Sequence, residues 1–184
     1  NVMPALMRLL AVGDAAVDDT LLHVSTAIAH LAKSTTCCAK MILAGVVRPL
    51  LAICKEASAS VAVQARSAEA LSLLSAYEAS QSLGGEDIRD AVECVMDGGV
   101  SQCGGVDVLL AVCSASTDGV VCGYAAAALG SLCGRDSSRA AMLELRIAAV
   151  LAEALDKVHV VEMLREVCGT VAKLAGYEDA RQAL

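Results

Sequence analysis

Hydrophobic residues recur along much of the chain at the three- and four-residue spacing of amphipathic helices. Val47, Leu50, Leu51 and Cys54 show this spacing within one short segment. Clusters of glycine and serine interrupt the pattern, and a serine or aspartate in such a cluster can cap the next helix. The pattern predicts a short first helix (about 37–44, 86–97 and 137–144), a second helix (46–55, 106–115 and 147–156) and a longer third helix (60–77, 119–134 and 158–176).

The same apolar positions return at regular intervals, which indicates an internal repeat. The second helices align Leu6, Leu50, Leu109 and Val150, at spacings of 44, 59 and 41. The third helices align Leu31, Leu74, Leu132 and Leu174, at spacings of 43, 58 and 42. Since the two series keep step, the long interval indicates an insertion of about 16 residues, shared between 80–85 and 98–105. The predicted repeats are 1–35, 36–79, 80–136 and 137–177, with the start of a further repeat at 178–184.

The repeated segments carry a family resemblance. The runs NVMPALMRLL at 1–10 and GVVRPLLAIC at 45–54 resemble the second helix of the armadillo repeat, and TAIAHLA at 26–32 is similar to its third helix. The resemblance covers nearly the whole chain. It implies an all-α, right-handed α-solenoid superhelix of armadillo-like three-helix repeats, in which the third helices line a concave groove. The Trp and Asn ladders that nuclear-import receptors carry on the third helix are absent, which argues against recognition of nuclear-localisation peptides.

Polar residues occupy aligned positions on the predicted third helices and are the candidate groove residues. His23, Arg66, Tyr124 and Glu166 lie one turn before the positions that hold the Trp and Asn ladders in nuclear-import receptors, and those positions hold Thr26, His30, Glu69, Ser131 and Lys173 among others. Ordinary solvation explains each of them individually, but their alignment favours binding. We therefore predict a non-enzymatic scaffold or adaptor that binds an extended segment or a helix of a partner protein.

Composition and charge restrict the class of partner. Hydrophobic residues make up 57% of the chain and aromatic residues only 2%, with no Phe or Trp, and the net charge is −7. An acidic, aromatic-poor chain is unsuited to nucleic acid. The negative charge falls in residues 86–184, with fifteen acidic and eight basic residues. A solvated face explains this acidity, but a second site for a basic partner is also predicted at Glu86, Asp87, Asp90, Glu93 and Asp97.

The sequence predicts neither catalysis nor a metal site. Its nine cysteines lack CxxC spacing, its three histidines form no HExxH motif, and no GxSxG elbow is present. We expect no cofactor and no small-molecule substrate. Most cysteines fall within apolar helical patterns, where a free thiol packs as a small apolar residue. This usage predicts a reducing compartment, the cytoplasm first, although a nuclear or cytoskeletal location fits the same composition.

The remaining expectations concern membranes and the chain ends. The longest uncharged stretch, 119–134, is 16 residues, short of the roughly 20 that a membrane-spanning helix needs. The first ten residues lack a basic leader and an initiating Met, so we expect no signal peptide and an excerpt of a longer chain. The favoured alternative function is a structural segment of a large assembly, for example a cytoskeletal one, that uses convex faces, the acidic insertion and open ends. A less favoured alternative is an α-helical enzyme.

Overall fold

The computed structural model describes residues 3–10, 18–56, 58–82, 100 and 104–182, which form helices and short connections and no strand. The helices are α1 (Met3–Leu10), α2 (Asp18–Leu31), α3 (Thr35–Leu43), α4 (Val47–Lys55), α5 (Val61–Ser82), α7 (Gly105–Ala115), α8 (Gly119–Leu132), α9 (Asp136–Glu144), α10 (Ile147–Lys157), α11 (Val161–Ala175) and α12 (Glu178–Arg181).

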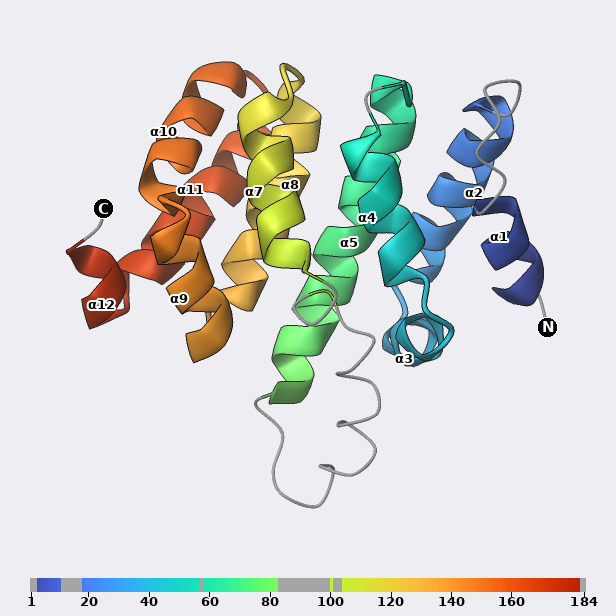
Figure 1. Ribbon diagram of the computed structural model, residues 1–184, viewed down its shortest axis with the longest axis horizontal. Coiled ribbons are helices and arrows are strands. Elements are labelled where there is room, and N and C mark those ends of the chain that lie inside the picture. The colour runs from blue at the N-terminus through green and yellow to red at the C-terminus, as the bar shows by residue number, and fades with distance from the viewer. Residues whose placement is uncertain (1–2, 11–17, 57, 83–99, 101–103, 183–184) are drawn as a thin grey trace.

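The helices form two layers that run along the long axis of the molecule, with the two chain ends at opposite ends of that axis (Figure 1). The third helices of the predicted repeats, α2, α5, α8 and α11, pack side by side in one layer. The second helices α4, α7 and α10 pack next to one another and cover that layer. The short first helices α3 and α9 lie across one edge (Figure 1). The architecture is therefore an all-α solenoid, as the resemblance implied.

The observed helices agree with the predicted pattern except at some ends. The second helices α4, α7 and α10 begin and end within one residue of the predicted positions. The third helix α5 continues to Ser82, five residues beyond the predicted end at 77. Its last turns contain Glu78, whose buried carboxylate contacts Arg135 at 2.9 Å and accepts a 2.8 Å hydrogen bond from the Val100 amide. The first helix predicted at 86–97 lies outside the described residues, and the division into repeats stays a prediction.

The turns before the second helices share an unusual backbone conformation. Gly45, Gly104 and Arg146 precede α4, α7 and α10 with φ angles of 78°, 72° and 58°. Glycine adopts this left-handed region without steric cost, whereas an L side chain at this φ costs about 1–2 kcal/mol. Because Arg146 keeps the conformation despite that cost, the geometry of the repeat prevails over local preference.

At the start of α8, the Asp118 carboxylate caps the helix by accepting from the Val120 and Val121 amides.

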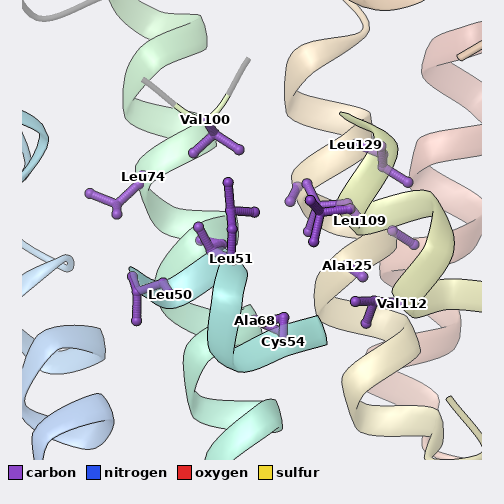
Figure 2. Packing of buried hydrophobic residues seen from close by; sticks show 14 of the residues in the cluster. Leu50, Leu51, Cys54, Ala68, Leu74, Val100, Leu109, Val112, Ala125 and Leu129 are labelled. Atoms are coloured by element: carbon purple, nitrogen blue, oxygen red, sulfur yellow. The ribbon is translucent and has the colours of Figure 1, made fainter. Parts of the chain in front are cut away.

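The hydrophobic core lies between the two layers and continues from repeat to repeat. Figure 2 shows Leu50 of α4, Leu74 of α5, Leu109 of α7 and Leu129 of α8, all of them fully buried.

Within the described residues no single helix is long and apolar enough to cross a membrane. The helices α3 and α4 meet the length and composition criterion only together, as a pair bent by 83°.

Small residues allow neighbouring third helices to approach closely. A Cβ built on Gly123 of α8 would lie 2.6 Å from the Met163 side chain of α11, and one on Gly130 would lie 2.4 Å from Thr170 Oγ1. The Thr170 hydroxyl donates a 2.8 Å hydrogen bond to the Ala126 carbonyl of α8. In contrast, a Cβ on Gly169 of α11 would meet no atom within 4 Å.

These two environments predict opposite effects of the same substitution. Gly130→Ala forces Thr170 away and weakens its buried hydrogen bond, so the free energy of unfolding should fall by about 2 kcal/mol. Gly169→Ala adds a methyl group in open space on a helix, so it should rise by up to about 1 kcal/mol. Urea unfolding followed by circular dichroism measures both. An equal response of the two variants would contradict close packing between α8 and α11.

Candidate functional site

The nine candidate groove residues differ in exposure. His23, His30, Arg66, Glu166 and Lys173 are exposed, whereas Thr26, Tyr124 and Ser131 are half-buried. Glu69 is the exception, because only 8% of its surface is exposed. All nine lie on the layer formed by α2, α5, α8 and α11.

Glu69 links two neighbouring third helices through ion pairs. Its carboxylate contacts the Arg66 guanidinium of the same helix at 2.7 Å and the Lys33 ammonium, just beyond the end of α2, at 3.7 Å. The sequence pattern did not indicate Lys33, because it lies outside the aligned positions of the third helix. With both carboxylate oxygens engaged, Glu69 holds Arg66 and Lys33 in place on the surface.

Tyr124 lies at the centre of a polar cluster that spans three third helices. Burial raises the pKa of its hydroxyl, and the negative charges of Glu69 and Glu166 raise it further, while Arg66 acts in the opposite direction. Arg66 and Glu69 come from α5 and Glu166 from α11, and both of these helices pack against α8, which carries Tyr124. The structure therefore brings together four predicted residues, which we call the Tyr124 cluster: Arg66, Glu69, Tyr124 and Glu166.

Two other predicted residues, Ser131 and Lys173, line a pocket of about 840 Å³ at the C-terminal ends of α5, α8 and α11. The Ser131 hydroxyl donates to the Ala127 carbonyl of its own helix. His23, Thr26 and His30 lie on α2, and no side-chain hydrogen bond joins them to the other predicted residues within the described part of the chain. They extend the same layer towards the N-terminus.

Sequence reasoning missed most of this pocket. Its wall includes Tyr177, which follows α11, and Gly134, which follows α8. The available signal was the recurrence of alanine and glycine near the ends of the aligned third helices. The predicted acidic site at Glu86, Asp87, Asp90, Glu93 and Asp97 lies outside the described residues.

The five buried cysteines offer little nucleophilic chemistry. Burial raises the pKa of Cys54 and Cys113 to about 12, and it also raises the pKa of Cys38, Cys122 and Cys133. Since the thiolate is the reactive form, these buried thiols stay protonated and inert at neutral pH. Among the residues that the structure covers, no three His, Cys, Asp or Glu side chains cluster as metal ligands would.

Comparison with known proteins tests the fold. No protein-family model and no curated protein matches the sequence. A crystal structure of computationally designed armadillo repeat proteins for modular peptide recognition is similar over 98% of this chain and 68% of that chain, with a TM-score of 0.72 and 19% identity. The chain has the armadillo-like repeat fold. A second designed armadillo repeat protein matches with a TM-score of 0.44 and 16% identity, over 98% of this chain and 85% of its own.

The charges of the Tyr124 cluster should shift the pKa of Tyr124, each in a direction that a substitution can test. In a Tyr77→Phe/Tyr177→Phe background, ultraviolet absorbance reports only Tyr124, whose pKa should lie above its ordinary value of 10.0. Glu69→Gln should lower this pKa, because it removes a negative charge, and Arg66→Gln should raise it. Glu162→Gln, elsewhere on α11, is the matched control and should leave it unchanged. Equal midpoints in all four proteins would show that the cluster does not form.

The buried thiols predict a loss of stability in alkali. In the unfolded chain thiols ionise near 9.0, whereas Cys54 and Cys113 stay protonated in the fold until about 12. Their contribution is therefore complete below pH 9 and is lost as the pH rises towards 12, because the unfolded state releases protons first. Urea unfolding across this range should show a shallower pH dependence for Cys113→Ala than for the unmodified chain. A Cys168→Ala variant, which removes an exposed thiol, is the control.

Proposed function

We propose that this chain is a non-enzymatic protein-binding scaffold or adaptor that binds a segment of a partner protein along its third helices. The surface consists of the exposed side of α2, α5, α8 and α11, the groove-lining layer of armadillo-like solenoids. The partner is an extended peptide or a helix, and it makes mixed polar and apolar contacts over several repeats. Nucleic acid is a poorer partner, given the net charge of −7.

The observation that carries this proposal is the Tyr124 cluster. Arg66, Tyr124 and Glu166 come from three successive third helices, and each presents a polar group on the same layer. Tyrosine and arginine are enriched where binding energy concentrates in protein interfaces. The ion pairs of Glu69 with Arg66 and Lys33 hold charged groups in position before a partner arrives, which lowers the entropy cost of binding.

The fold supports the proposal in a general way. The designed armadillo repeat proteins of similar structure were made for modular peptide recognition. Repeats that stack in one direction place equivalent side chains at regular intervals, and a long partner segment gains affinity from many small contacts. A cytoplasmic location fits the seven described cysteines, all of which are free thiols.

Exposed apolar side chains favour a second candidate, a structural segment of a larger assembly. Val161 at the start of α11 is 66% exposed, and Leu155 of α10 and Leu145 before it are also exposed. These residues lie in the last repeat, away from the Tyr124 cluster. In an assembly they would be buried against a neighbouring subunit.

A comparison of two triple variants tests the proposal. The first variant removes polar groups from the third-helix layer and combines Arg66→Ala, Tyr124→Ala and Glu166→Ala. The matched control removes exposed charges from the second helices α4, α7 and α10 and combines Arg48→Ala, Asp107→Ala and Glu153→Ala. Each tagged protein is used for affinity purification with quantitative mass spectrometry. Helicity and thermal unfolding by circular dichroism establish that both variants are folded.

We expect at least one partner to be lost from the third-helix variant and retained by the control. Loss from the control alone would favour the structural candidate, because the second helices would then carry the contact. Retention of every partner by both variants would contradict binding along the third helices.

A further inference from the structure

The pocket at the C-terminal ends of α5, α8 and α11 exists because its lining residues are small. Six of them, Ala76, Ala79, Gly130, Gly134, Ala172 and Gly176, carry a methyl group or no side chain. Its volume of about 840 Å³ falls within the range of ligand sites, roughly 300–1,000 Å³. Ala76, Gly134, Ala172 and Gly176 are exposed, so the pocket opens to solvent. It can therefore accept a large apolar side chain from outside.

One wall of the pocket is an aromatic ring held in a fixed position. The guanidinium of Arg139 stacks on the Tyr177 ring, 4.1 Å from its centroid. Arg139 also donates to both carboxylate oxygens of Asp179, at 3.1 and 2.8 Å, and to the Cys133 carbonyl at 3.0 Å. These contacts join the end of α8 to α9 and α12. Since Arg139 is nearly buried, the ring is rigid before any ligand arrives.

Arg135, which also lines the pocket, is held in place by a second ion pair. Glu78, fully buried on α5, contacts Arg135 beyond the end of α8 at 2.9 Å and accepts a hydrogen bond from the Val100 amide. This ion pair fixes the spacing of α5 and α8 across the pocket. Because the two charges neutralise one another, Lys173 supplies the net charge of the lining.

Two side chains of the lining can donate to a ligand. Lys173 is exposed and has no ion-pair partner among the described residues, and the Tyr177 hydroxyl makes no hydrogen bond there. No acidic residue is among the described residues that line the pocket. Lys173 of α11 and Tyr177, which lies beyond the end of that helix, line the same pocket, and both side chains can donate to a carboxylate.

The helix ends do not turn this pocket into a cation site. C-terminal helix carbonyls attract positive charge when they are unpaired. Here the carbonyls of Leu132 and Cys133 accept from the Arg135 amide and the Arg139 guanidinium, and that of Gly130 accepts from the Cys133 thiol. The Lys173 and Leu174 carbonyls accept from the amides of Gly176 and Tyr177. The charge of Lys173 therefore dominates.

We propose that this pocket binds an acidic and apolar anchor of the partner segment: a large aliphatic or aromatic side chain between the small residues, with an adjacent carboxylate paired to Lys173 and Tyr177. The inference rests on the proposed function, because it assigns one end of the third-helix surface and the chemistry of the peptide that occupies it. A basic segment is disfavoured at this end, since it would place like charge beside Lys173.

The test uses a display library of short random peptides, selected on the unmodified chain. Labelled copies of the selected peptides are then measured by fluorescence anisotropy. Ala172→Leu fills the pocket from an exposed helix position, and Lys173→Glu reverses its charge. The matched controls are Ala175→Leu and Arg165→Glu, which change exposed positions of the same helix outside the lining. Circular dichroism verifies that all four variants are folded.

We expect the selected peptides to be rich in Asp or Glu next to a large apolar residue. Each pocket variant should weaken binding roughly tenfold or more, and the controls should leave it unchanged. Lys173→Glu should also shift a new selection towards Lys or Arg beside the apolar residue.

Two results would overturn the inference while leaving the proposed function intact: basic peptides selected by the unmodified chain, or peptides that bind the pocket variants normally but are lost from the Arg66, Tyr124 and Glu166 triple variant. A library that yields no binding peptide would contradict both.

Discussion

The close approach of successive third helices is the packing constraint on which the rest of the structure depends. At α8 and α11 it requires Gly123 and Gly130, because any side chain there would occupy the space of Met163 or Thr170. At α2 and α5 a pair of small hydroxyls takes this role, with Ser67 donating to Ser25 at 3.4 Å. This close packing sets the spacing of the repeats, and the spacing in turn decides which surface residues become neighbours.

The same choice of small residues has a different consequence at the helix ends. Within the stack, a missing side chain is compensated by the neighbouring helix. Towards the C-terminal ends of α5, α8 and α11 the small residues leave an open pocket instead. Two ion pairs lie beside it: Glu78 with Arg135, whose carboxylate is fully buried, and Arg139 with Asp179, whose carboxylate is half exposed. A buried pair is costly to break by removing one partner, so the pocket keeps its shape without a ligand.

The third-helix layer thus carries two chemically different regions. The Tyr124 cluster is polar, with charges of both signs, and Glu69 balances Arg66 and Lys33 within it. The pocket is apolar at its base and positive at Lys173. Under the proposed function, a partner that contacts both regions would present charged groups to the Tyr124 cluster and an acidic, apolar anchor to the pocket.

The sequence by itself determined the helices, the repeat and the fold, since the three- and four-residue periodicity and the two aligned leucine series depend only on residue order. It also indicated which faces of the third helices carry polar groups. It could not show that Glu69 is buried and pairs with both Arg66 and Lys33. It also could not show that α5 continues past Tyr77, where Glu78 forms an ion pair with Arg135, 57 positions further along the chain. The pocket likewise required tertiary structure. Its lining comes from three helices, and small residues become a cavity only when the backbones around them are fixed in space.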